Sequence, residues 1–292
     1  MQVFLSSHPA VSFLPEINLI RRFVLNGELN QVHGQEGEGK TLELLTADPK
    51  LKRLPYSWQE LLPEETTEDF GESLFQNLVS RHCDSSSTYV GYKDALLIQS
   101  ATEVLTRWGN SKIVHIYRDP RDVLASRKKA DWSKDYPVWR NVIAGMIQLR
   151  IINQCRASGY ADRIVDVKYE DLLAKPASVA ENVCKFLRLD YDPDMLEFNR
   201  KAEDLVFSDE LQWKKNLFSP ILKGNSGKWK EQLTPHEIAL VEGAYRNEMQ
   251  ELGYENSNAW GSLSLFEKLS VQCQLIWLRT VKKIYFLKKS VL

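Results

Sequence analysis

The residues best arranged for chemistry lie where an apolar run ends and the sequence Arg-Asp-Pro-Arg-Asp-Val-Leu-Ala-Ser begins at Arg118. The near-continuous apolar residues at 112–117 predict a strand buried in a parallel sheet. Asp119 can cap a helix that starts at Pro120, which would place Arg118 beside free backbone N–H groups and the positive end of the helix dipole. A guanidinium holds phosphate as a fork, and the Ser126 hydroxyl, one or two helical turns on, could reach the same phosphate. The pattern therefore predicts an anion site, although a structural Arg–Asp pair and a surface serine explain the same residues.

A second phosphate motif lies at residues 34–41, which read Gly-Gln-Glu-Gly-Glu-Gly-Lys-Thr and satisfy the pattern GxxxxGKT. In nucleotide hydrolases and kinases such a loop cradles phosphates, and it follows a buried strand. Residues 27–33 are a poor strand, and Glu36 and Glu38 would bring negative charge into an anion nest. We therefore favour a solvated glycine-rich loop over 26–41. A nucleotide hydrolase or kinase that uses Lys40 and Thr41 remains the alternative function.

The order of predicted elements indicates an α/β fold. Short apolar runs predict strands, and longer periodic stretches predict helices between them. Such alternation is typical of three layers, with a parallel sheet between helices on both faces. Residues 26–88, with the loop at 26–41 and a polar, proline-containing stretch at 46–70, form the expected variable insertion. The strands are expected at 9–14, 89–92, 112–117 and 164–167; the helices from Pro15 to Phe23, over 95–108, from Pro120, over 137–158, over 176–187 and from a capping box at 234–237.

Composition excludes several classes of protein. A chain of 292 residues is long enough for one large domain or for a domain with an appendage. Its 38 basic and 39 acidic residues nearly cancel, which argues against a nucleic-acid partner over the whole surface. The four cysteines have no metal-ligand spacing, so no metal site is expected. The first residues have neither the charged head nor the apolar stretch of a signal peptide, which predicts a cytoplasmic protein.

Residues 263–292 differ from the rest of the chain. Six basic residues stand against Glu267 alone, and apolar residues alternate with them. This pattern is typical of an amphipathic helix on an anionic membrane surface, although a helix docked on the protein's own core has similar periodicity. We therefore expect a basic helical tail, with peripheral membrane contact as one of two alternatives.

Several blocks, in the same order along the chain, resemble sulfotransferases that use 3′-phosphoadenosine 5′-phosphosulfate, in particular the tyrosylprotein and bacterial branches. Residues 113–126 resemble the family's 3′-phosphate-binding signature, and Lys-Tyr-Glu-Asp-Leu-Leu from Lys168 resembles its next block. Ser-Gly-Lys-Trp at 226–229 is similar to the C-terminal cofactor loop, and residues 8–16 and 91–94 match blocks nearer the catalytic centre. The resemblance runs to about residue 255. It implies a sulfotransferase-like domain over 1–260 with a fold like that of P-loop nucleotide hydrolases, followed by a tail over 261–292.

The resemblance also implies a 5′-phosphosulfate loop, and a strand leading into it, just before the helix expected at residues 1–5. The 292 residues contain no such segment. We therefore expect a fold that lacks this first strand and loop, with reduced cofactor affinity and turnover.

The family's roles can be carried to particular residues. Glu16 would be the base for an acceptor hydroxyl, and Lys93, at the carboxyl edge of the sheet, would neutralise the transferring sulfonyl group. Arg118 and Ser126 would hold the 3′-phosphate, Tyr169 would position the nucleotide, and Ser226, Gly227 and Lys228 would close over it. The product would be adenosine 3′,5′-bisphosphate, the acceptor a peptide, carbohydrate or lipid hydroxyl, and no metal is required.

Less specific interpretations of the same residues stay open. Glu16 could be an acid in a first helical turn, Lys93 a loop lysine and Tyr169 a core residue. The chain could then be a non-catalytic member of the family that acts as a binding or membrane-surface module.

Overall fold

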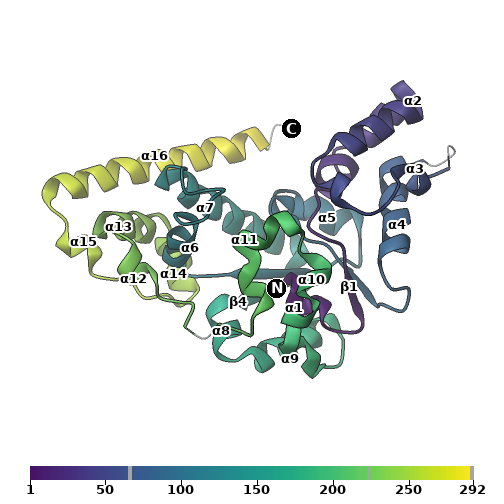
Figure 1. Ribbon diagram of the computed structural model, residues 1–292. Coiled ribbons are helices and arrows are strands. Elements are labelled where there is room, and N and C mark those ends of the chain that lie inside the picture. Colours follow the sequence, from purple (N-terminus) through teal and green to yellow (C-terminus); the bar gives the residue numbers. More distant parts are fainter. Residues whose placement is uncertain (65–67, 223, 290–292) are drawn as a thin grey trace. The chain divides into compact units, whose positions relative to one another are not determined.

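The computed structural model describes residues 1–64, 68–222 and 224–289. The chain forms two compact units, each made of two separate stretches of sequence (Figure 1). The first unit comprises Met1–Ile113 and Lys175–Leu222, and the second comprises Val114–Ala174 and Lys223–Leu292.

The first unit is built around two short parallel strands, β1 (Val11–Phe13) and β2 (Tyr89–Gly91). Val11 pairs with Tyr89 and Phe13 with Gly91, and the Leu14 N–H donates to the Gly91 carbonyl at 3.1 Å. Because parallel strands end at the same edge of a sheet, the segments that follow β1 and β2 emerge together. Residues 14–18 and 92–94 are therefore neighbours.

Helices of varied length surround this pair of strands. Their buried apolar side chains form one cluster, whose fully buried members include Leu14, Phe23, Leu29, Leu45 and Leu74. The helical elements of the unit are α1 (Gln2–Ser6), a π-helix (Ile20–Val24), α2 (Glu28–Ala47), a 3-10 turn (Leu51–Arg53), α3 (Trp58–Leu61), α4 (Phe70–His82), a 3-10 turn (Leu97–Ser100), α5 (Ala101–Arg107), α9 (Pro176–Leu187), a 3-10 segment (Pro193–Lys201), α10 (Ala202–Leu205), a 3-10 turn (Ser208–Glu210), α11 (Leu211–Lys214) and a 3-10 turn (Lys215–Phe218).

The loop expected at 26–41 is wrong for residues 28–41, because these lie in α2. The helix is kept in place by its apolar side chains, since Leu29 and Leu45 are fully buried. It is interrupted at Gly37, whose φ of 80° and ψ of −174° belong to a region that only glycine adopts readily. The Lys40 ammonium donates to Glu43 at 2.9 Å, and the Thr41 hydroxyl donates to the Gly37 carbonyl at 3.0 Å. The GxxxxGKT sequence therefore forms no phosphate-binding loop, and the nucleotide hydrolase alternative loses its site.

Two glycines of α2 provide a test of this helical arrangement. Gly34 has ample room for a methyl group, so Gly34→Ala is expected to raise the free energy of unfolding by about 0.5 kcal/mol through a less flexible unfolded chain. Gly37→Ala is expected to lower it by about 1–2 kcal/mol, because alanine is strained at this φ and ψ. Urea denaturation at pH 7 measures both. Equal effects of the two substitutions would contradict a helix broken at Gly37.

The helix expected from Pro15 is also wrong at its start, because the π-helix begins only at Ile20. The Tyr92 hydroxyl donates to the Ile17 carbonyl at 2.8 Å and accepts from the Ile20 N–H at 3.2 Å. A side chain from the segment after β2 thus satisfies backbone groups that helical hydrogen bonds were expected to satisfy. Glu16 therefore lies in an irregular segment and not in a first helical turn.

The second unit contains β3 (Ile113–Tyr117) and β4 (Ile164–Lys168), which are neighbours in a second two-stranded sheet. The first residue of β3, Ile113, is counted in the first unit. They are joined through α6 (Pro120–Arg127), α7 (Val138–Cys155) and two short turns (Arg156–Tyr160 and Ala161–Arg163), the kind of helical connection that parallel neighbours require. β3 is half-buried and Ile116 is 38% exposed, so the expected fully buried strand is wrong in this respect. In the described part of the unit, β4 is the only strand beside it.

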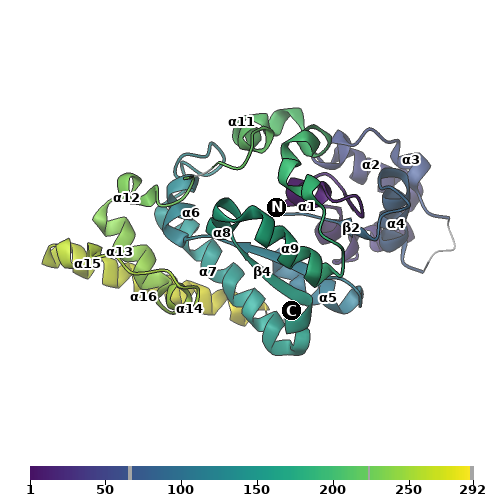
Figure 2. The same ribbon diagram turned by 90° about the horizontal axis from the view of Figure 1, so that it is seen from below.

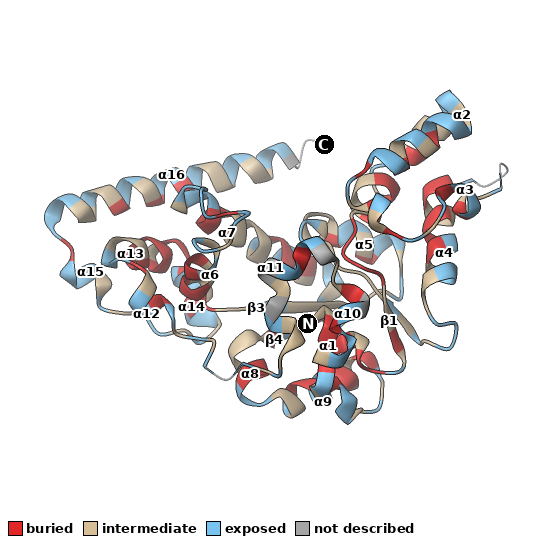
Figure 3. Ribbon diagram, in the orientation of Figure 1, coloured by how far each residue is buried: buried red, intermediate tan, exposed pale blue. Residues whose placement is uncertain are grey.

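The remaining helices of this unit close its core. Thr234 and Glu237 form the expected capping box at the start of α13 (Pro235–Ala244), most of which is buried (Figure 3). The other helices are α8 (Tyr169–Ala174), α12 (Trp229–Gln232), α14 (Arg246–Glu251), α15 (Ala259–Ser262) and α16 (Leu265–Lys289). Strands joined through helices confirm the α/β class, and the described strands form one two-stranded sheet in each unit.

The basic tail forms α16, which lies beside α13 (Figure 2). Val271 and Leu278 are fully buried in the core of the second unit, and Leu275 is 9% exposed. The expectation of a helix docked on the protein's own core is thus correct for this face of α16. No helix among the described residues combines the length and the apolar character needed to cross a membrane.

Candidate functional site

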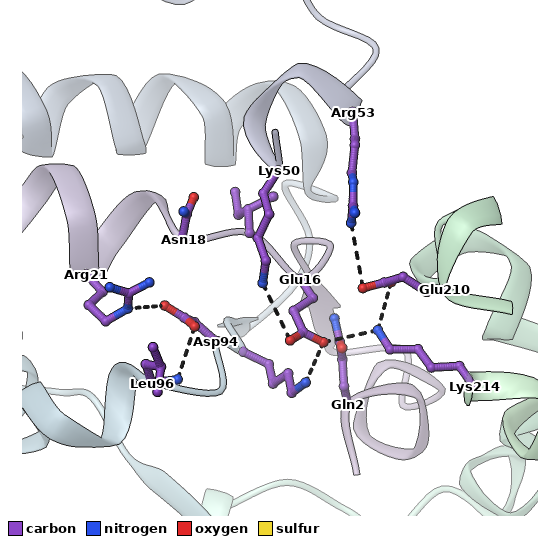
Figure 4. Close-up of polar contacts among 12 residues, drawn as sticks. Gln2, Glu16, Asn18, Arg21, Lys50, Arg53, Asp94, Leu96, Glu210 and Lys214 are labelled. Atoms are coloured by element: carbon purple, nitrogen blue, oxygen red, sulfur yellow. Dashed lines mark hydrogen bonds and ion pairs between the residues drawn. The ribbon is translucent and has the colours of Figure 1, made fainter. Parts of the chain in front are cut away.

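Glu16 lies at the centre of a charged cluster in the first unit (Figure 4). It follows β1, and Lys93 follows β2, so the parallel pairing brings the two side chains together; the Lys93 ammonium donates to Glu16 Oε2. Lys214, in α11, donates to the same oxygen at 3.1 Å, and the Lys50 ammonium lies 3.7 Å from Glu16 Oε1. The Glu16 side chain is 10% exposed and that of Lys93 is 44% exposed. A buried carboxylate therefore meets three ammonium groups.

The lysines control the pKa of Glu16. Burial raises this pKa, but the charges and hydrogen bonds of Lys93 and then Lys214 outweigh burial and lower it to about 2. The carboxylate is thus fully ionised at neutral pH. A second acid, Glu210, accepts from Lys214 at 2.8 Å and is 6% exposed at its side chain, so the positive charge of the cluster is shared between two buried acids.

Stability at low pH should report this pairing. The Glu16 pKa is lower in the folded chain, about 2, than the ordinary 4.5, so its stabilisation is fully present above pH 4.5 and is lost as the pH falls towards 2. Up to about 3 kcal/mol of unfolding free energy is expected to disappear over this range. Lys93→Met removes the strongest partner of Glu16, so the pKa of Glu16 rises towards 4.5. The variant therefore loses less unfolding free energy than the unaltered chain as the pH falls below 4.5.

Urea denaturation at pH 7, 4.5 and 3 measures this dependence. Lys52→Met is the matched control, because Lys52 is exposed and makes no ion pair with the described residues. If Lys93→Met and Lys52→Met show the same loss of stability between pH 4.5 and 3, Lys93 does not control the Glu16 carboxyl.

Arg118 is the centre of a second cluster, in the second unit. Its Nη2 donates to the Asn225 carbonyl at 2.7 Å and lies 3.5 Å from Asp122 Oδ2, and its guanidinium carbon lies 4.7 Å from the centre of the Tyr169 ring. Its Nε is buried and has no hydrogen-bond partner among the described residues. A buried charged donor without a partner is costly in a folded protein, and a ligand with an acceptor oxygen would satisfy it.

Asp122 connects the segment at 225–229 to α6 through two hydrogen bonds. This buried carboxylate accepts from the Gly227 N–H at 2.7 Å and from the Trp229 N–H at 3.0 Å. The φ of Gly227 is 75°, in the left-handed region that favours glycine. Asn225 donates to the Tyr169 hydroxyl at 2.7 Å and accepts from the Lys228 ammonium at 2.7 Å. Residues from three distant parts of the sequence thus form one hydrogen-bonded network around Arg118.

The second arginine of the same motif is structural. Arg121 is 4% exposed, and its guanidinium pairs with Asp119 at 2.8 Å and with Glu242 at 2.7 Å. It also lies over the Trp229 ring at 3.9 Å, so Trp229 is a packing residue. Asp119 caps α6 and Pro120 occupies its first turn, as the sequence predicts. Of the two arginines, Arg118 is the one with a donor left for a ligand.

A cavity of about 250 Å³ opens beside Arg118 within the second unit. Charged and aromatic side chains contribute to its wall, together with apolar residues from α7 and α14. The lining includes one acid, Glu248, and the two arginines and the aromatic rings suit a planar ligand that carries negative charge. Its lining includes Tyr117, Arg118, Arg127, Leu149, Tyr169 and Met249.

The predicted site residues fall into two groups. Glu16 and Lys93 are in contact in the first unit, whereas Arg118, Tyr169, Gly227 and Lys228 belong to the network of the second unit, with Ser226 between Asn225 and Gly227. Ser126 is exposed on α6, one turn after Asp122, and its hydroxyl bonds to none of the described residues. Its role as a phosphate ligand stays a prediction.

Four residues of these clusters were not predicted from the sequence. Asp122 could have been recognised, because it lies in the first turn of the helix expected from Pro120, only four residues after Arg118. Asn225 directly precedes the predicted cofactor loop. Lys50 and Lys214 carry no local signal, since they are 34 and 198 residues away from Glu16 and only the folded unit brings them there.

Comparison with known proteins identifies the family. A sequence profile described as "Sulfotransferase family" matches residues 1–193, about two thirds of the chain. The chain belongs to the sulfotransferase family. The matched part of this member of the sulfotransferase family contains Glu16, Lys93, Arg118, Ser126 and Tyr169, and it ends before the loop at 226–228.

Two curated sulfotransferases show the extent of the likeness. Rat Sulfotransferase 2A1 (Rattus norvegicus) is 25% identical over 162 residues, which are 48% of this chain and 57% of the relative. Mouse Carbohydrate sulfotransferase 1 (Mus musculus) is 22% identical over 171 residues, which are 51% of this chain and 40% of the relative. The chain spans about half the length of these relatives.

A solved structure supports the fold. The sulfotransferase domain from the curacin biosynthetic pathway is similar to 88% of this chain, over 93% of its own length, with a TM-score of 0.52 and 18% identity. The likeness confirms the α/β fold expected of a sulfotransferase domain.

Proposed function

We propose that the chain transfers a sulfonyl group from 3′-phosphoadenosine 5′-phosphosulfate to a hydroxyl acceptor. Family membership supports sulfonyl transfer in general. The observation that carries the proposal is the contact between Glu16 and Lys93 at the ends of two parallel strands, where α/β proteins place their ligands.

The residues around Arg118 fit the nucleotide that the family implies. The unpartnered Nε of Arg118 offers a buried, charged donor to a phosphate, and the cavity beside it is lined by the Arg127 guanidinium and the Tyr117 and Tyr169 rings. Lys228 carries a further positive charge on the segment that Asp122 fastens. When bound, the nucleotide supplies a sulfonyl group activated by its phosphate linkage. Arg118 and Ser126 would hold the 3′-phosphate, and Lys228 would close over the nucleotide and help to fix its position.

Glu16 would take the proton of the acceptor hydroxyl at one of its carboxylate oxygens. Its low pKa makes it a weak base while Lys93 and Lys214 pair with it. Lys93 is 44% exposed and can turn from Glu16 towards an incoming anion. Loss of that partner would raise the Glu16 pKa, so Glu16 would become a stronger base when a sulfonyl donor is present. Lys93 would meanwhile stabilise the charge on the moving group.

Transfer of a labelled sulfonyl group tests the proposal. The chain is incubated with ³⁵S-labelled donor and a panel of peptide, carbohydrate and lipid hydroxyl acceptors; the name of the mouse relative makes carbohydrates the first to try. Calorimetry compares adenosine 3′,5′-bisphosphate with adenosine 5′-phosphate, and only the bisphosphate is expected to bind tightly. Tight binding of the bisphosphate without transfer to any acceptor would favour a non-catalytic member of the family, and equal binding of both nucleotides would overturn the 3′-phosphate site.

A further inference from the structure

The long C-terminal helix α16 has apolar residues on two opposite faces. One face carries Val271, Leu275 and Leu278, which fill the core of the second unit. The opposite face points to solvent and carries large apolar side chains at spacings of three, seven and eight residues, all of which return to the same side of a helix and so place them on one face. The stripe comprises Phe266 (82% exposed), Leu269 (57%), Ile276 (62%), Ile284 (48%) and Leu287 (56%).

The stripe is too large to be an ordinary feature of a surface. Single exposed apolar residues are common, but five large ones on one face of a 25-residue helix, with only the exposed Cys273 and Thr280 between them on that face, mark an interaction surface. Trp277, beside the stripe, is 43% exposed and contacts Trp139 edge to face, with ring centres 4.6 Å apart. Exposed tryptophans are enriched where a protein meets the boundary between water and lipid.

Positive charge accompanies the stripe. A cavity of about 380 Å³ between α7 and α16 is lined by Arg150, Arg279, Lys282 and Lys283, together with Phe286 and Leu287. Its lining contains no acidic side chain, and the nearest acid beside it is Glu248, which lines an adjoining cavity together with Arg150 and Lys282. Four cations around an apolar floor suit a phosphate group attached to acyl chains.

Charge also distinguishes between the partners that could cover the exposed face of α16. A second copy of the chain would bring the same cations against one another, which disfavours a symmetric contact through this face. The apolar core of the second unit is already filled by the other face of α16. An anionic lipid surface complements both the apolar stripe and the basic cavity.

We propose that α16 attaches the protein to anionic membranes. The stripe from Phe266 to Leu287 inserts among the lipids at the boundary, and Arg150, Arg279, Lys282 and Lys283 bind lipid phosphates. The helix lies along the surface and remains docked on the second unit. This inference does not depend on sulfonyl transfer.

Vesicle flotation of the full chain tests the proposal. Vesicles of phosphatidylcholine alone are compared with vesicles that contain phosphatidylserine, and the protein is expected to float with the anionic vesicles and to be released by high salt. Lys282→Gln with Lys283→Gln is expected to weaken binding about 25-fold, since each cation near an anionic surface contributes a factor of about five. Phe266→Ser with Ile276→Ser should abolish flotation. Leu96→Ser, an exposed apolar residue of the first unit, is the matched control and should leave it unchanged.

Other outcomes overturn the inference. Equal binding to neutral and anionic vesicles would remove the role of the basic cavity. Binding of inorganic phosphate in the cavity without flotation would make the cavity a site for a soluble anion. Loss of a concentration-dependent dimer in Phe266→Ser with Ile276→Ser, measured by sedimentation without lipid, would make the stripe a contact between copies. Circular dichroism of each variant distinguishes lost attachment from lost folding.

Discussion

Arg118→Ala is expected to weaken the binding of adenosine 3′,5′-bisphosphate about 100-fold, which corresponds to about 3 kcal/mol. The substitution removes a guanidinium whose Nε has no partner among the described residues and which lines the cavity of the second unit. Arg118→Lys should restore only part of the affinity, because an ammonium cannot bind a phosphate with two parallel hydrogen bonds. Isothermal titration calorimetry measures the affinity for the bisphosphate of the unaltered chain and of both variants.

Two controls isolate the phosphate contact. Arg118 also bonds Asn225 and approaches Asp122, so thermal unfolding must show that the second unit of Arg118→Ala remains folded. Lys40→Ala removes the lysine of the GxxxxGKT sequence, which is exposed in α2, and should leave binding unchanged. Loss of binding in Lys40→Ala with full binding in Arg118→Ala would reject the 3′-phosphate site.

Glu16→Gln is expected to lower the rate of sulfonyl transfer by about 10²- to 10⁴-fold, the usual contribution of a positioned general base. Glutamine has nearly the same shape but cannot accept the hydroxyl proton. Bisphosphate binding should not weaken, because the substitution leaves Arg118 and the hydrogen bonds around it unchanged. Steady-state kinetics with saturating donor measures the rate, and calorimetry measures the binding.

Glu210→Gln is the matched control for this substitution. Glu210 is a buried acid of the same cluster that pairs with Lys214 and with Arg53, and no contact of Glu210 with Lys93 is among those described. Glu210→Gln should keep most of the transfer activity, and its free energy of unfolding should fall by about as much as that of Glu16→Gln. Similar losses of rate in Glu16→Gln and Glu210→Gln would show that Glu16 acts only through the structure of the cluster.

Local signals in the sequence predicted the second cluster better than the first. The cap at Asp119 and the proline at position 120 fix the start of α6, and both are local features that operate in the same way in most proteins. The same holds for the capping box at Thr234. Arg118 could therefore be placed next to the end of a strand without knowledge of the rest of the fold.

Long-range packing explains the wrong predictions. Three glycines between residues 34 and 39 favour a loop, but burial of Leu29 and Leu45 keeps α2 helical on both sides of Gly37. Pro15 is a good start for a helix, yet the Tyr92 hydroxyl holds the following segment in another conformation. No local pattern could show that Lys50 and Lys214 meet Glu16, because that contact depends on the tertiary structure of the first unit.

The division of each unit between two stretches of sequence affects how the protein can be made. The chain crosses from one unit to the other three times, so neither can be produced from a single uninterrupted piece of the gene. On the ribosome, Arg118 is synthesised long before Asn225 and α16, which complete its surroundings and close the core around it. Until they emerge, the early half of the second unit exposes apolar surface that chaperones would have to shield.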